Sequence, residues 1–175
     1  MRLRSSIFAW VKRLFIPLLF IQLCIPIKAV NLRNIAAPTT DVPQELALSD
    51  AHKLAATIPG ATVVLIEGKS MRPHFDTGCL VIIKQQPFNT LKPGATVLYC
   101  TSEDELVLHR LVEKSPTGWS VEGLNNVVMD PEKVTSQNYK GVMYVTFYTS
   151  PGQNLAALQG TTVALAKTYT PTRKQ

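Results

Sequence analysis

The sequence predicts a mainly β protein, a small and partly closed antiparallel β-barrel or sandwich that follows an apolar N-terminal helix. Several short runs are rich in Val, Ile, Leu and Tyr, which is typical of strands. Gly and Pro separate these runs, so the connections between them are expected to be close turns. Neither a helical repeat nor an alternation of strands with long helices is found, which argues against a parallel α/β fold. Short strands joined by close turns favour a sheet that curls on itself.

The expected elements of the body begin with a short helix over residues 50–58, which Ser49 would cap and Pro59 with Gly60 would end. After Pro151 the tail is expected to hold a short helix near 154–159 and a strand near 162–166, to which we assign no role. The strands expected between these two parts are residues 61–67, 80–84, 96–100, 106–113, 119–122 and 141–148.

The first 29 residues are expected to be an export signal or a membrane anchor. An uncharged apolar run, residues 14–27, follows a basic flank and is short for a helix that spans a bilayer. Ala29 fits a cleavage site, so a cleaved signal and a retained anchor both stay open. With the basic flank inside, the chain after Val30 is expected to lie outside the cytoplasm, in the periplasm, in the medium or on the outer face of the inner membrane. The basic residues of the flank are Arg2, Arg4, Lys12 and Arg13.

The formal charge of +6 is mainly a property of this N-terminal segment. The chain has 18 basic and 12 acidic residues, and five of the basic ones and none of the acidic ones precede Val30. The body has no basic patch with interleaved aromatic residues, which argues against a nucleic-acid partner. No Cys/His cluster has the spacing of metal ligands, so no metal or other cofactor is expected. After the N-terminal segment only Cys79 and Cys100 remain, as one disulfide or as two free thiols.

Ser70 is the first candidate for chemistry, because it stands between an apolar strand and a turn. Gly68 lets the backbone bend or approach a bound chain closely, and Pro73 stiffens the turn that follows. A hydroxyl on a stiff bend at a strand end is either an ordinary turn residue or a nucleophile that needs a base.

His109 and Asp130 supply the other two groups of a serine triad. His109 interrupts an apolar strand, as a core residue or as a base, while its neighbour Arg110 points to the opposite face and is structural. Asp130 precedes Pro131 and is either a turn acid or a carboxylate turned inward. Ser70, His109 and Asp130 together match the nucleophile, base and orienting acid of that chemistry.

Three segments, in this order, resemble the signal peptidase I family of S26-type serine peptidases. Residues 68–73 (GKSMRP) resemble its nucleophile box, and 91–97 (LKPGATV) resemble the entry of a conserved strand. Residues 108–113, then 123–126 with Asp130, resemble the base box and the acidic box. The His-Arg pair in the base box is similar to the endoplasmic-reticulum-type branch, in which His replaces Lys. The resemblance implies a mostly β catalytic domain, membrane association, and cleavage after small residues in extended export signals.

The resemblance also implies roles for single residues. Ser70 would attack a peptide carbonyl, His109 would take its proton, and Asp130 would hold the imidazole tautomer. The Ser70 backbone N–H would help to bind the oxyanion, since Gly68 has no hydroxyl to offer. An extended peptide or preprotein would add as a strand beside those leading to Ser70 and His109. The substrate-binding residues expected at the bend are Gly68, Lys69, Met71 and Pro73.

Departures from the family pattern keep other functions open. Leu124, Met129 and Ala95 stand where the family carries acidic residues, so a decayed relative that binds peptides without cleaving them is the alternative. A Ser–Lys dyad through Lys84 or Lys92 is a further enzymatic alternative. A self-cleaving repressor-type peptidase shares the bend but needs a DNA-binding N-terminus and a Lys base. The domain prediction is an export signal or anchor over 1–29, a linker with a short helix over 30–60, a catalytic domain over 61–150 and a C-terminal extension over 151–175.

Overall fold

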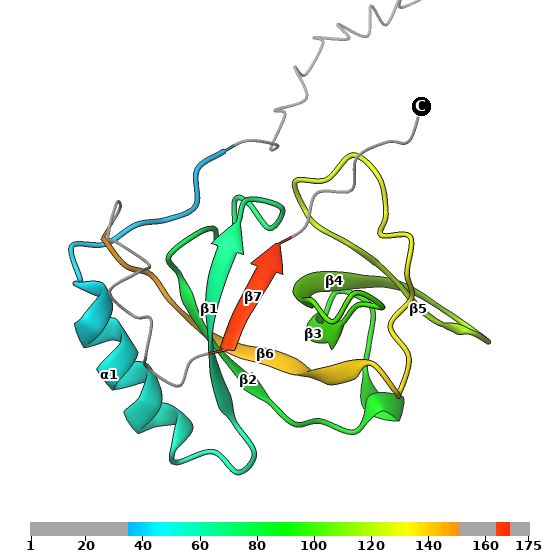
Figure 1. The fold of residues 1–175 in the computed structure, drawn as a ribbon, viewed down its shortest axis with the longest axis horizontal. Helices are drawn as coiled ribbons and strands as arrows, with labels where there is room; N and C mark the ends of the chain where they lie inside the picture. Colours follow the sequence, from blue (N-terminus) through cyan, green and yellow to red (C-terminus); the bar gives the residue numbers. More distant parts are fainter. Residues whose placement is uncertain (1–34, 151–163, 169–175) are drawn as a thin grey trace, which may run out of the picture. The chain divides into compact units, whose positions relative to one another are not determined.

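The computed structural model describes residues 35–150 and 164–168. Seven strands form one sheet in the order β3-β6-β2-β1-β7-β4-β5, and β3 also pairs with β4. Because this extra pairing joins strands near opposite ends of the order, the sheet curls on itself (Figure 1). The mainly β, partly closed fold is therefore confirmed. The elements are α1 (Gln44–Ala55), β1 (Thr62–Gly68), β2 (Leu80–Lys84), the 3₁₀ turn η1 (Phe88–Thr90), β3 (Thr96–Cys100), β4 (Leu106–Ser115), β5 (Gly118–Glu122), β6 (Tyr139–Phe147) and β7 (Ala164–Thr168).

The expected strands agree well with the observed ones, because each is an apolar run between turn residues. The strands over 80–84 and 96–100 have the predicted bounds, and the others between residues 61 and 148 differ by one or two residues at their ends. The last strand lies two residues later than expected, at 164–168 instead of 162–166. The apolar N-terminal helix, the export segment over 1–29 and the helix near 154–159 fall outside the described residues.

The predicted start of the first helix was wrong. Helix α1 begins at Gln44, six residues before the expected start, and Pro43 stands at its N-cap without a side-chain capping bond. Ser49, expected as the cap, lies inside the helix. The reason is a buried face that includes Ala47, Leu48 and Ala51, since burial of this face against the sheet extends the helix through a residue with a preference for caps.

Strand β1 is buried on both faces, which explains its uninterrupted apolar sequence. Val63 and Leu65 pack with α1 and β2 on one side. Val64 and Ile66 point to the opposite side, into a core that also contains Met71. The strand that leads to Ser70 is thus fixed from two directions.

No helix among residues 35–150 and 164–168 has the length and apolar character needed to cross a bilayer.

Part of the predicted linker is held against the body. The Thr40 hydroxyl donates to the carbonyl of Tyr148 at 3.1 Å, and the Ser150 N–H donates to the carbonyl of Val42 at 2.9 Å.

The two cysteines of the body are free thiols, Cys79 buried and Cys100 half-buried, so the predicted alternative of a disulfide is not formed.

Candidate active site

Ser70 lies two residues beyond the end of β1, on a bend that hydrogen bonds hold in place. Gly68 has a φ of +114°, which side chains rarely adopt, and this explains why glycine stands there. Its N–H donates to the Thr77 hydroxyl at 2.8 Å, and its carbonyl accepts from the Thr77 N–H at 2.9 Å. The Ser70 side chain is completely buried, and its Oγ lies 2.7 Å from Nε2 of His109.

His109 comes from β4 and is completely buried as well. Its Nδ1 lies 2.5 Å from Oδ2 of Asp130. Because an ionised carboxylate only accepts hydrogen bonds, Nδ1 must carry the proton, which leaves the lone pair of Nε2 to accept from the Ser70 hydroxyl. The three side chains predicted from the sequence are therefore brought together in one chain of hydrogen bonds.

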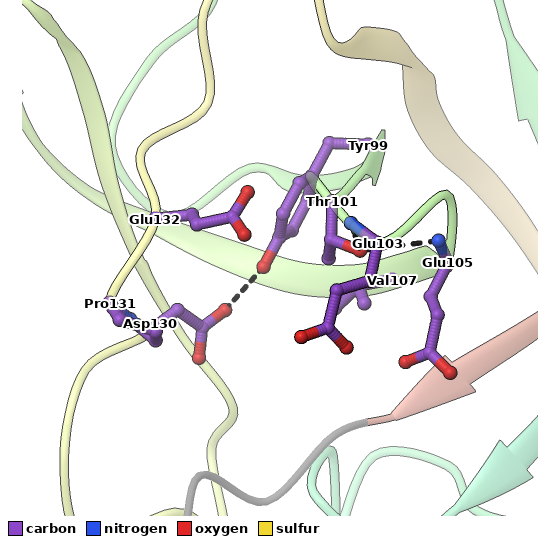
Figure 2. Close-up of a pocket in the computed structure, with 8 residues that line it drawn as sticks. All are labelled: Tyr99, Thr101, Glu103, Glu105, Val107, Asp130, Pro131 and Glu132. Atoms are coloured by element: carbon purple, nitrogen blue, oxygen red, sulfur yellow. Dashed lines mark hydrogen bonds between the residues drawn. The ribbon is translucent and has the colours of Figure 1, made fainter.

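Asp130 follows β5, and its side chain is only 3% exposed. Its N–H donates to the carbonyl of Val121 at 2.9 Å, which fixes the backbone just before Pro131. The Tyr99 hydroxyl donates to Oδ2 at 2.6 Å, while Oδ1 is buried without a hydrogen-bond partner in the described part of the chain. Oδ2 thus accepts both from His109 and from Tyr99. Figure 2 shows the second of these bonds, between the Tyr99 hydroxyl and Asp130.

Tyr99 is a site residue that reasoning from the sequence missed. It is 2% exposed, and burial, followed by the negative charge of Asp130, raises its pKa far above the usual range. The phenol therefore stays neutral and remains a donor. On β3, Val97 is the partner of His109 and Tyr99 is the partner of Val107, so Tyr99 faces the same side as the histidine. Only the register between β3 and β4 shows that Tyr99 belongs to the site, and this register is not visible in the sequence alone.

The peptidase S24-like family model matches residues 21–144, a span that includes Ser70, His109 and Asp130. The chain belongs to the peptidase S24-like family. No curated protein and no solved structure matches it significantly. Membership supports a serine peptidase-type hydrolase with a fold related to that of signal peptidase I. It does not extend to the signal peptidase I family itself, so the resemblance seen in the sequence is confirmed only at this broader level.

A tight turn braces the nucleophile of this S24-like peptidase from outside the triad. A Cβ on Gly123 would lie 2.8 Å from Cβ of Ser70 and 2.7 Å from Nδ2 of Asn126, closer than real Cβ atoms come. The Asn125 N–H donates to the Ser70 carbonyl at 2.6 Å. The segment singled out as resembling an acidic box therefore packs directly on the serine, and its glycine is required by space rather than by φ.

The four residues expected to bind substrate lie in different environments. Lys69 is exposed and Pro73 is half-buried, following a cis peptide bond with Arg72. Met71 is completely buried and packs in the interior core that also contains Ile66. Met71 thus supports the bend from the core, whereas Gly68 stabilises the bend through the hydrogen bonds of its backbone with Thr77.

The residues behind the competing predictions lie in different surroundings. Lys84 stacks its Nζ 4.6 Å from the ring centroid of Tyr144, and Lys92 is exposed in a turn. Leu124 packs partly against the interior core, and Met129 is 51% exposed. Arg110 forms an ion pair with Glu122 through a side chain that is 41% exposed, and its structural role stays a prediction.

A hollow of about 90 Å³ opens beside the acid of the triad (Figure 2). It contacts Asp130 but neither Ser70 nor His109, so a scissile bond bound there would not meet the hydroxyl. Among the residues that the structure describes, no group of three or more His, Cys, Asp or Glu side chains is arranged to hold a metal ion. The lining residues are Tyr99, Thr101, Glu103, Glu105, Val107, Asp130, Pro131 and Glu132.

Proposed function

We propose that the protein is a serine endopeptidase in which Ser70 is the nucleophile, His109 the general base and Asp130 the acid that orients it. One observation carries the proposal: the Ser70 Oγ–His109 Nε2 contact of 2.7 Å continues through the Nδ1–Asp130 Oδ2 contact of 2.5 Å. The three residues are far apart along the sequence and are buried together. Such a nucleophile, base and orienter arrangement is the signature of nucleophilic catalysis.

The proposed reaction follows from these contacts. As the Ser70 oxygen bonds to a peptide carbonyl carbon, its proton passes to Nε2 of His109, while Nδ1–H keeps its bond to Asp130. The imidazolium then gives the proton to the leaving amine as the C–N bond breaks, which leaves an ester on Ser70. Water, activated by the same imidazole, hydrolyses the ester and restores the hydroxyl. The Ser70 backbone N–H is the donor expected for the oxyanion, since Gly68 has no side chain.

The proposed substrate is an extended peptide, such as the export signal of a preprotein. Support comes from the sequence resemblance to signal peptidase I and from the strands that flank the triad, since β1 leads to Ser70 and β4 carries His109. An extended chain that adds to such strands gains backbone hydrogen bonds. The basic flank and apolar run within residues 1–29 support an extracytoplasmic location and membrane attachment before processing.

The proposal is tested by cleavage of an extended peptide library with the Ser70→Ala and His109→Ala proteins. Both substitutions should abolish cleavage while the circular dichroism spectrum stays that of a folded protein; the melting temperature of the His109→Ala protein should fall, because His109 is buried against Asp130. The matched control is His74→Ala, because His74 is also a histidine near the bend but its side chain is exposed. Cleavage by the Ser70→Ala protein at the wild-type rate would exclude the serine mechanism.

A catalytically decayed peptide-binding relative is the second candidate, favoured by Leu124 and Met129 at positions where the resemblance expects acids. It predicts that the wild type binds extended peptides without turning them over. Loss of turnover only in the Ser70→Ala and His109→Ala proteins would exclude it, because a decayed site has no turnover to lose.

A further inference from the structure

Strand β7 lies between the two strands that flank the triad (Figure 1). It runs parallel to β1, with register pairs from Val64 with Ala164 to Gly68 with Thr168. Its other edge meets β4 through a single pair, Val107 with Lys167. A short strand from the C-terminal part of the chain therefore fills the space that an added peptide strand would need in order to reach both Ser70 and His109.

The side chains of the first three residues of β7 alternate between the interior and solvent. Ala166 is completely buried in the interior core, together with Ile66, Met71 and Leu108, and Ala164 packs partly against the same core. Leu165, between them, is 45% exposed. In its described part, the strand thus contributes its backbone and the small side chains of Ala164 and Ala166, which is how an extended peptide is recognised along a sheet edge.

The reacting groups are closed to solvent in this arrangement. Ser70 and His109 are each 0% exposed. A peptide cannot bring its carbonyl to a completely buried hydroxyl unless part of the chain moves away. Strand β7 pairs with β1 at five positions but is joined to β4 by one residue pair, so the edge toward β4 is the one at which it would separate first.

We propose that β7 is an intramolecular pseudosubstrate, which occupies the peptide groove between β1 and β4 and leaves it when an extended peptide binds. This inference rests on the proposed function only in taking that groove as the peptide site. The C-terminal tail, which had no role assigned from its sequence, then regulates access to the triad.

Mass action gives the factor by which bound β7 weakens the binding of a free peptide. A segment tethered through residues 151–163 competes at an effective concentration on the order of millimolar, far above that of most free peptides. The apparent affinity for a free peptide falls in proportion to the fraction of molecules with an open groove. If β7 occupies the groove in nine molecules out of ten, displacing it permanently strengthens peptide binding about tenfold.

The test measures binding in the full-length Ser70→Ala protein, so that no cleavage intervenes. The probe is a fluorescent peptide with the sequence of residues 160–172 of this chain, followed by anisotropy. Adding Ala166→Glu places a charge in the interior core and should expel the strand, so the peptide should bind about tenfold or more tightly. The matched control is Leu165→Glu, on the exposed face of the same strand, which should leave the affinity unchanged.

Hydrogen exchange of the Ser70→Ala protein without further substitutions provides a second readout that needs no change in the core. Saturating peptide should remove the protection of the amides of residues 164–168 while that of β1 persists. Equal peptide affinity with and without Ala166→Glu, or full protection of β7 at saturating peptide, would overturn the inference and make β7 a permanent wall of the barrel. Absence of turnover in an Ala166→Glu protein that retains Ser70 and binds the peptide would instead refute the peptidase proposal alone.

Discussion

Replacing Tyr99 by Phe removes one hydroxyl from the site and leaves the shape of the side chain unchanged. Tyr99 is 2% exposed and donates to Oδ2 of Asp130 at 2.6 Å. The substitution leaves His109 as the hydrogen-bond donor to Oδ2, while Oδ1 already lacks a partner in the described part of the chain. A buried charge thus loses a donor, and both stability and catalysis should respond.

The expected loss of stability at pH 8 is about 1.5–3 kcal/mol, the usual contribution of a hydrogen bond to a charged group. At alkaline pH a second effect reduces this difference in unfolding free energy between the wild type and the Phe variant. Burial and the Asp130 carboxylate raise the pKa of Tyr99 in the folded state above its unfolded value of 10.0, so only the unfolded chain loses this proton near pH 11. The wild type therefore loses about 1.4 kcal/mol between pH 8 and pH 11 through Tyr99, and the Phe variant does not.

Urea unfolding of both proteins at pH 8 and pH 11 measures both quantities. The difference in unfolding free energy should be about 1.5–3 kcal/mol at pH 8 and smaller by about 1.4 kcal/mol at pH 11. Peptide cleavage should show a lower kcat with little change in KM, because Tyr99 acts through Asp130 and not on the substrate. A difference that stays constant with pH would refute the assignment of Tyr99 as a buried neutral donor, and an unchanged kcat would refute its positioning role.

Three further substitutions probe the site and its surroundings. Gly123→Ala would bring a Cβ to 2.8 Å from that of Ser70, so we expect about 1–3 kcal/mol of destabilisation by urea unfolding and a fall in kcat of roughly a hundredfold. Asp130→Asn should reduce kcat on the order of 10⁴-fold with the fold retained, since an amide no longer fixes the imidazole tautomer; a fall of less than tenfold would contradict this. Arg110→Ala removes a partly exposed ion pair, so stability should change by less than about 1 kcal/mol and cleavage should be unaffected.

Much of the fold follows from local sequence patterns. The runs that became β2 and β3 are apolar and bounded by turn residues, so their bounds could be predicted to the residue. Helix α1 was different, because Ser49 and Asp50 are typical of a cap while the buried face that includes Ala47 and Leu48 extends the helix past them. Tertiary burial overrode the local preference, and no local pattern reports it.

The site was predictable where it depends on residue chemistry and unpredictable where it depends on pairing. Ser70, His109 and Asp130 stand out because a hydroxyl, an imidazole and a carboxylate each interrupt or end an apolar run. Tyr99 reads as an ordinary strand residue until β3 is placed beside β4. Likewise, the position of β7 between β1 and β4 is a long-range pairing, which a run of small residues in the tail does not reveal.

The most direct test of the central proposal is the reaction of the folded protein with a fluorophosphonate, followed by peptide mapping in a mass spectrometer. The experiment uses the wild type and the Ala166→Glu protein, each with and without His109→Ala. A Ser–His–Asp triad predicts a single phosphonyl adduct on Ser70 that is lost when His109 is replaced. Absence of an adduct on Ser70 in both His109-containing proteins, or an adduct that forms equally fast without His109, would contradict the account.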